Sequence, residues 1–126
     1  MHISRIDHIV LTVNDIRTTV RFYETVLGMR SETFGANRIA LVFGQQKINL
    51  HQYRHEFEPK ADTPLPGSQD LCFITTMELP AAMEHVRGLG VKILQGPVER
   101  TGATGAIESF YFRDPDLNLI EVGVYS

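Results

Sequence analysis

The stretch FYFRDPDLNLIEVGVYS, residues 110–126, decides the fold because it reads as two strands joined by a tight turn. Aromatic residues come first, the turn-forming run DPD follows at residues 114–116, and apolar residues then alternate as in a strand. Glu121 lies among those apolar residues, where an ionised carboxylate costs free energy unless a cation or hydrogen bonds compensate for it. The stretch predicts a closing β-hairpin with a compensating group beside Glu121.

The composition is that of a globular protein with one domain, since 43% of its 126 residues are hydrophobic and 21% are charged. The net charge of -3 and the scattered basic residues argue against a nucleic-acid surface. No apolar run has the length of a signal peptide or of a membrane span. The single Cys72 lies in an apolar run, and it excludes an internal disulfide and a cysteine metal cluster. We expect a cytoplasmic protein with small-molecule or protein partners, bound to neither membrane nor nucleic acid.

The first half of the chain reads as strand, helix and three strands. The run RIDHIVLTV alternates in polarity, Asn14 can cap the helix that follows, and Gly28 can end it. The three further strands are predicted at residues 30–34, 38–43 and 46–53.

The same pattern restarts at Asp70, after a polar, proline-bearing connector at residues 54–69. A strand DLCFITT precedes a helix that Pro80 can open and whose apolar stripe includes Leu89. The offset from His8 to Asp70 is 62 (70 − 8), and the offset from Leu27 to Leu89 is also 62 (89 − 27). Equal offsets indicate a duplicated unit. We predict the next strand at residues 91–95, a glycine-rich loop at residues 101–105, and then the closing hairpin.

The sequence therefore predicts an α+β fold in which tandem βαβββ modules form a curved mixed sheet with the helices on its outer face. The modules span about residues 4–53 and 70–125 within a single domain of residues 1–126. Because alternate strand residues point to opposite faces, the branched apolar residues are assigned to the helix side. The groups left for the concave side can bind metal: His8, Asn49, His51, Asp70 and Glu121.

A histidine or carboxylate in a strand is usually structural when considered alone. Groups of this kind on the same face of four strands instead favour a divalent metal site with an open position for substrate. Arginine side chains such as Arg38, Arg54, Arg100 and Arg113, together with Lys60, are candidates to hold an anionic substrate, although solvated surface charge is the simpler interpretation.

The chain resembles the vicinal oxygen chelate superfamily, which includes glyoxalase I, fosfomycin-resistance proteins, extradiol dioxygenases and bleomycin-resistance proteins. The segments DHIVLTV, DLCFIT and YFRDPDLNLIEV look like the two module-starting strands and the closing hairpin of that superfamily. The segments KINLH, EFEPKA, PGSQD and RTGATGAI followed by YFRDPD are similar to the glyoxalase domain-containing protein 5 type.

The resemblance implies that His8 and Glu121 are metal ligands. It also implies that the protein binds one divalent ion, which can be Ni, Zn, Mn, Co or Fe. The sequence differs from the glyoxalase I pattern at two of the ligand positions. It has Asp70 where glyoxalase I has a histidine, and Asn49 where glyoxalase I has a glutamate. His51 lies two residues after Asn49 on the same face, so we predict His51 as the fourth ligand and Asn49 as the alternative ligand or a substrate contact.

The activity implied is that of a glyoxalase I-like lyase or isomerase on a thiol adduct of an α-oxoaldehyde. Glu121 and Asp70 are its predicted catalytic carboxylates, and Arg38, Arg113 and Tyr111 join Asn49 as predicted substrate contacts. The alternatives are Fe(II)-dependent oxygenation, thiol transfer to an epoxide such as fosfomycin, and binding of a small molecule without catalysis. The resemblance also implies a homodimer.

Overall fold

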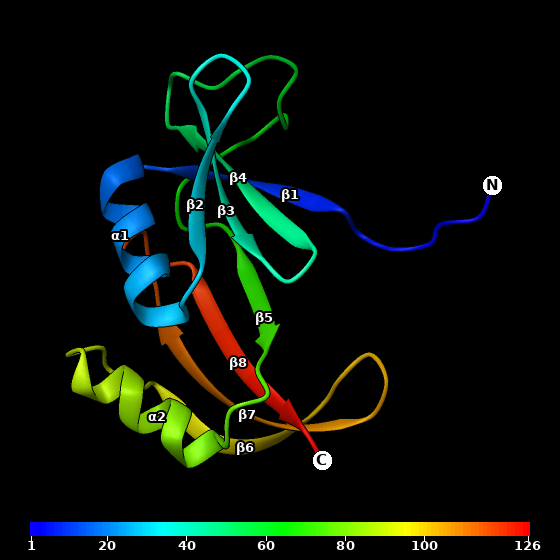
Figure 1. Ribbon diagram of the computed structural model, residues 1–126, viewed down its shortest axis with the longest axis vertical. Helices are drawn as coiled ribbons and strands as arrows, with labels where there is room; N and C mark the ends of the chain where they lie inside the picture. The colour runs from blue at the N-terminus through cyan, green and yellow to red at the C-terminus, as the bar shows by residue number, and fades with distance from the viewer. The chain divides into compact units, whose positions relative to one another are not determined.

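The protein consists of two compact units, Met1–Ser68 and Gln69–Ser126, in a computed structural model that describes all of residues 1–126. Each unit contains one helix and one four-stranded sheet (Figure 1). The predicted α+β class and the βαβββ order of each module are therefore confirmed, although the strands form two mixed sheets rather than one.

The first unit has its strands in the order β1-β4-β3-β2. Strands β1 and β4 are parallel, and the other two pairs are antiparallel. The elements are β1 (His8–Val13), α1 (Ile16–Leu27), β2 (Arg30–Phe34), β3 (Arg38–Phe43) and β4 (Gln46–Gln52).

Helix α1 begins and ends at residues suited to those positions. Asp15, not the predicted Asn14, is its N-cap, and Asp15 Oδ1 accepts a hydrogen bond from the Thr18 backbone N–H at 3.0 Å. Gly28 ends the helix at φ 67°, in the left-handed region that glycine tolerates. Together, α1, β2 and β3 line a surface hollow that includes Thr33 and Ile39. Because Thr33 and Ile39 pair across the strands, α1 covers their face of the sheet.

The second unit repeats this arrangement with the strand order β5-β8-β7-β6. Strands β5 and β8 are parallel, and the other pairs are antiparallel. The elements are β5 (Asp70–Ile74), α2 (Leu79–Gly88), β6 (Gln95–Thr101), β7 (Ala106–Arg113) and β8 (Leu119–Tyr125).

The turn between β7 and β8 is built by side chains as the sequence predicts. Asp114 Oδ1 accepts backbone hydrogen bonds from Asp116 at 2.9 Å and Asn118 at 3.0 Å. The Asn118 amide donates to Asp114 Oδ2 at 2.8 Å, and its Oδ1 accepts the Gln69 N–H at 2.9 Å. The buried Asp114 and Asn118 side chains therefore close the hairpin and also fix the start of β5.

Two local predictions in the second unit are wrong. The strand predicted at residues 91–95 lies instead at residues 95–101, after an irregular segment. Leu89 does not belong to the buried stripe of α2, since it caps the C-terminus and is 43% exposed. The residues that α2 buries are Leu79, Ala82, Met83 and Val86.

The division of each sheet into an apolar and a polar face follows the predicted alternation. Leu11, Val13, Ile48 and Leu50 are buried in the first unit, and Ile120 is buried in the second. The opposite faces carry the predicted polar groups. In the first unit the Lys47 ammonium of β4 lies 3.8 Å from the ring centroid of Phe34 in β2, so these two long side chains meet over β3 on the polar face.

Candidate functional site

The first unit places His8 and Asn49 on the polar face of two neighbouring parallel strands. His8 pairs with Lys47, and Val10 pairs with Asn49, so Asn49 is two residues along β4 from the partner of His8. Residues at even spacing in a strand share a face. His8 and Asn49 are therefore diagonal neighbours.

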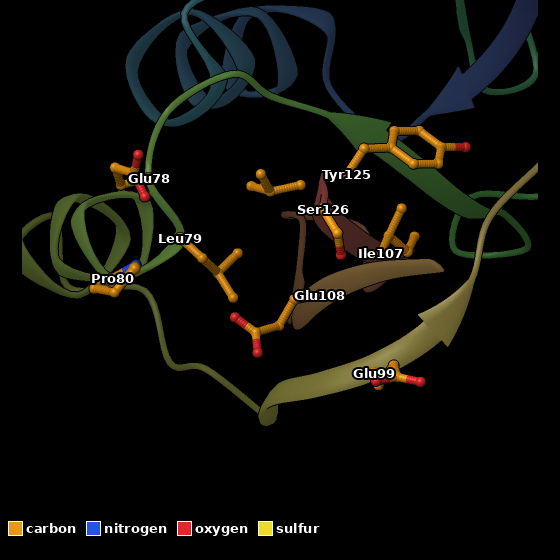
Figure 2. A pocket seen from close by; sticks show the side chains of 9 residues that line it. Glu78, Leu79, Pro80, Glu99, Ile107, Glu108, Tyr125 and Ser126 are labelled. Carbon is orange, nitrogen blue, oxygen red and sulfur yellow. The ribbon is translucent and has the colours of Figure 1, made fainter. Parts of the chain in front are cut away.

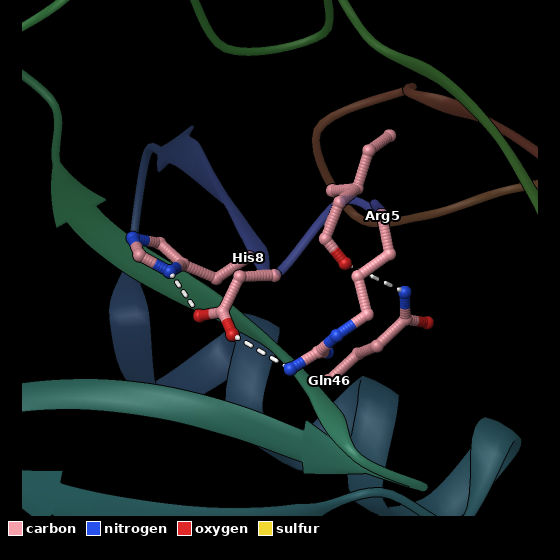
Figure 3. A network of polar contacts seen from close by, with 5 residues as sticks. Arg5, His8 and Gln46 are labelled. Atoms are coloured by element: carbon pink, nitrogen blue, oxygen red, sulfur yellow. Dashed lines mark hydrogen bonds and ion pairs between the residues drawn. The ribbon is translucent and has the colours of Figure 1, made fainter. Parts of the chain in front are cut away.

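His8 presents one ring nitrogen for ligation. Its Nδ1 donates a hydrogen bond to Asp7 Oδ2 at 2.9 Å, and Arg5 Nη2 lies 3.5 Å from Asp7 Oδ1 (Figure 3). Gln46 donates to the Ile6 carbonyl at 3.2 Å beside this pair. A histidine whose second nitrogen is held by a carboxylate is the usual arrangement for metal ligation, because that contact fixes the tautomer. Nε2 of His8 has no hydrogen-bond partner within the protein.

Asn49 carries an unsatisfied polar atom in a buried position. Its side chain is 6% exposed, and its Oδ1 has no hydrogen-bond partner within the protein. A buried carbonyl oxygen without a partner costs about 1–3 kcal/mol. This oxygen is therefore suited to a metal ion or to a donor group of a substrate.

His51 is engaged differently. Its Nε2 lies 3.3 Å from Nη2 of Arg38, and a guanidinium can only donate, so Nε2 is the acceptor and the ring is neutral. Burial, and then the charge of Arg38, lower the pKa of His51 below its ordinary value. The Arg38 guanidinium also lies 5.3 Å from the Phe34 ring centroid and 4.8 Å from that of Phe57. One ring nitrogen of His51, the predicted fourth ligand, is thus engaged by Arg38.

The second unit repeats the diagonal of His8 and Asn49 with two carboxylates. Asp70 pairs with Leu119, and Glu121 is two residues further along β8. Asp70 is therefore equivalent to His8, and Glu121 is equivalent to Asn49. Position 51 has its equivalent at Gly123, which has no side chain.

An open hollow of about 420 Å³ includes these carboxylates within the second unit. Arginine and tyrosine side chains line it beside them, so the hollow contains both anionic and cationic groups. Its lining residues are Asp70, Leu94, Gln95, Arg100, Tyr111, Arg113, Leu119 and Glu121.

Cys72 belongs to the same face, which the sequence interpretation missed. It pairs directly with Glu121 across the two parallel strands. Although Cys72 keeps part of its surface exposed, burial of its thiol, and then the charge and hydrogen bond of Glu121, raise its pKa to about 11. Its spacing of two residues from Asp70 is the signal that could have placed it here.

Another hollow, of about 240 Å³, lies on the helix side of the second unit and is separate from the Glu121 face. Glu78 and Leu79 at the start of α2 border it together with Glu99 and Glu108 (Figure 2). Within either unit, no three His, Cys, Asp or Glu side chains gather closely enough to hold a metal ion. No helix is long and apolar enough to span a membrane.

Residues 5–122 match the family model of the Glyoxalase/Bleomycin resistance protein/Dioxygenase superfamily. The chain belongs to this superfamily. Its fold is therefore the vicinal oxygen chelate fold, in agreement with the two βαβββ modules.

Close relatives of this superfamily member have names that state little about activity. The virulence protein STM3117 of Salmonella typhimurium is 61% identical, with 99% of this chain and 87% of that protein covered. The glyoxalase domain-containing protein RDO1 of Mycosarcoma maydis is 51% identical, with 99% and 70% covered. The solved structure of integron cassette protein VCH_CASS1 from the mobile metagenome of V. cholerae is 66% identical in sequence and has a TM-score of 0.98. The match covers 100% of this chain and 98% of that chain.

More distant solved structures share the fold. Lactoylglutathione lyase from Agrobacterium tumefaciens has a TM-score of 0.72 at 22% identity, with 96% of this chain and 93% of that chain covered. FosX from Listeria monocytogenes, a fosfomycin resistance protein solved with Mn(II) and dihydroxypropylphosphonic acid, has a TM-score of 0.66 at 22% identity, with 97% and 90% covered.

Proposed function

We propose that the protein is a divalent-metal-dependent enzyme of the glyoxalase I type, which isomerises the hemithioacetal of an α-oxoaldehyde and a thiol. The observation that carries this proposal is the repeated diagonal, since His8 with Asn49 and Asp70 with Glu121 have the same relation in the two units. One imidazole nitrogen and three oxygen donors form a ligand set that suits a divalent ion such as Mn or Zn.

The four proposed ligands are His8, Asn49, Asp70 and Glu121, from one chain or from two chains. We prefer Asn49 to the predicted His51 because Oδ1 of Asn49 has no partner, whereas Nε2 of His51 accepts from Arg38. A metal bound by this set would act as a Lewis acid that stabilises negative charge on the substrate oxygens.

Glu121 is the proposed proton carrier. In the isomerisation, its carboxylate takes the proton from the carbon that bears sulfur and returns it to the adjacent carbon, so that a hemithioacetal becomes a 2-hydroxyacyl thioester without net loss of atoms. The Cys72 thiol lies across the paired strands from Glu121, and burial, followed by the charge and hydrogen bond of Glu121, raises its pKa to about 11 in the metal-free protein. Asp70 lies beside it on the same face and supplies the second carboxylate.

The experiment is an assay of thioester formation from methylglyoxal and glutathione after loading with Ni, Zn, Mn or Co. We expect turnover with at least one metal, and a loss of at least about a hundredfold in Glu121→Gln, since general base catalysis contributes about that factor. Glu84→Gln, an exposed helix position, is the matched control. Absence of turnover with every metal would remove the isomerase proposal.

The same protein preparations test the alternatives. Consumption of fosfomycin with a thiol would indicate epoxide opening, and oxygen uptake with a catechol under Fe(II) would indicate a dioxygenase. Tight binding of a small molecule without turnover would indicate a binding protein.

We also propose a homodimer, because each sheet has two edge strands whose backbone groups can pair with a second chain. Light scattering that detects only monomers at micromolar concentration would contradict it.

A further inference from the structure

The helix side of the first unit carries a surface that the proposed function does not use. An open hollow of about 440 Å³ is lined by α1, β2 and β3. Since Ala40 pairs with Asn49, the adjacent Ile39, which lines the hollow, points to the opposite face of the sheet. Ile39, Ile16 and Val20 are half-buried and give the hollow an apolar floor. The hollow is therefore apolar at its base and lies away from the proposed metal ligands of this unit.

Two arginines that line this hollow have no anionic partner. Arg17 and Arg21 are exposed on successive turns of α1, and neither forms an ion pair or hydrogen bond within the chain. Like charges four residues apart in a helix repel each other. Glu24 does not neutralise them, because its Oε2 accepts from the Ser31 hydroxyl at 3.0 Å and from the Ser31 N–H at 3.4 Å. The hollow therefore favours a negatively charged ligand.

The free edge of the first sheet borders the same hollow. β2 is an edge strand whose one neighbour is β3, and α1 lies beside it (Figure 1). The Ser31 N–H donates to Glu24 and not to β3, so it points to the free edge. Because alternate residues of an antiparallel strand have the same orientation, Thr33 also directs its N–H and C=O to this edge. A strand added to β2 would therefore lie along the hollow.

The spacing of the two arginines matches that of side chains in a strand. Residues four apart in a helix are separated by about 6 Å along its axis. Alternate residues of a strand share a face and are about 6.7 Å apart. Two carboxylates at alternate positions of an added strand can therefore contact Arg17 and Arg21 together, and each guanidinium offers parallel N–H donors to a carboxylate. An apolar residue at the next alternate position would contact the apolar floor.

We propose that the free edge of β2 and the adjoining hollow bind an extended acidic segment of another protein. The segment adds a strand to the first sheet and places two carboxylates, two residues apart, against Arg17 and Arg21. In this mode of recognition the backbone hydrogen bonds supply affinity, and alternate side chains supply specificity. The inference goes beyond the proposed function and does not rest on it.

The experiment titrates synthetic peptides into the isotope-labelled full chain. The blocked hexapeptide TETETV has two glutamates at alternate positions, its isomer TTEETV has them adjacent, and TQTQTV is neutral. NMR follows the Thr33 amide and the Arg17 and Arg21 side chains. We expect TETETV to shift these resonances saturably and TQTQTV to leave them unchanged. TTEETV should bind about fivefold more weakly, because one of its carboxylates loses its arginine.

N-methylation of TETETV tests the pairing of backbones. One form is methylated at its odd residues and the other at its even residues. Since only one alternate set of N–H groups can face β2, one form should lose binding and the other should keep it.

Variants of the protein test the charges. Arg17→Gln and Arg21→Gln should each raise the dissociation constant of TETETV about threefold, and together about tenfold, because each removes one exposed ion pair. Glu24→Gln should lower it, since the amide oxygen still accepts from Ser31 but no longer repels an acidic ligand. Arg87→Gln, at an exposed position of α2 outside the hollow, is the matched control and should leave the dissociation constant unchanged.

Equal binding of TETETV and TTEETV, or of the two N-methylated forms, would overturn the inference, because no added strand would then be needed. Displacement of TETETV by an equal concentration of inorganic phosphate would reduce the surface to a simple anion site and would also overturn it. A change from dimer to monomer when Arg17 and Arg21 are both replaced by Gln would assign the surface to a second copy of this chain instead. None of these measurements uses a metal or turnover, so their outcome is independent of the proposed enzyme activity.

Discussion

At the scale of single residues, the free acceptor of Asn49 distinguishes it from His51. We predict that Asn49→Ala weakens binding of Zn(II) or Mn(II) at least about tenfold, a loss typical of changes close to a metal. Asn49→Asp should tighten binding, because a carboxylate replaces a neutral amide at the same place. His51→Gln should leave the affinity within about twofold. Calorimetric titration of the three variants is the measurement, and a larger loss in His51→Gln than in Asn49→Ala would restore His51 as the ligand.

Cys72 gives a second test at this scale, in protein freed of metal by a chelator. Its pKa of about 11 compares with an ordinary value of 9.0, so its thiolate fraction at pH 8 is about a hundredfold lower than that of an ordinary thiol. Alkylation by iodoacetamide should be slower by about that factor than in urea, and its rate should rise with pH until the pH passes 11. Glu121→Gln should lower the pKa and speed the reaction. Equal alkylation rates in the folded and unfolded protein would contradict a raised pKa of Cys72.

The residue scale also explains which parts of the site could be predicted. Strict alternation along β4 and β8 places Asn49, His51 and Glu121 on the polar faces, and the sequence is sufficient for that. The contact between Arg38 and His51 depends on how β3 pairs with β4. No periodicity within one strand reveals such a partner.

At the scale of elements, the close packing of β6 against β7 requires a glycine at position 96. Gly96 has φ +131°, and an added Cβ would lie 2.5 Å from Phe110 Cβ and 2.7 Å from Phe110 Cα in the neighbouring strand. We predict that Gly96→Ala lowers the free energy of unfolding by about 2–4 kcal/mol, because backbone cannot move aside as a flexible side chain can. Urea denaturation is the measurement. Gly88→Ala, with open space around it, is the control, and it should be neutral or stabilising.

Gly96 lies in the irregular start of β6, which the strand prediction at residues 91–95 misses. The apolar residues Val91, Ile93 and Leu94 alternate loosely as in a strand, but the ladder with β7 starts at Gln95 and shifts register between Gln95 and Val98. A bulge of this kind is set by the neighbouring strand. By contrast, strands 30–34 and 38–43 were predicted to the residue, because glycine turns bound them.

At the scale of the whole molecule, the duplication makes a prediction that neither unit makes alone. If one ion is bound by residues of both units, then a metal at a hundred times its dissociation constant stabilises the folded chain by about 2.7 kcal/mol. For a chain of this size, that corresponds to a rise in Tm of about 10 °C. Thermal unfolding recorded with and without Zn(II) or Mn(II) measures the rise in Tm.

The decisive comparison is between variants from different units. His8→Gln in the first unit and Glu121→Gln in the second should each abolish most of the rise in Tm if both side chains are ligands of the same ion, as proposed. His85→Gln, an exposed histidine on α2, should keep it. A full rise in His8→Gln together with none in Glu121→Gln would mean that the ion is bound by the second unit alone. The repeated diagonal would then be a consequence of the duplicated fold, without a shared function.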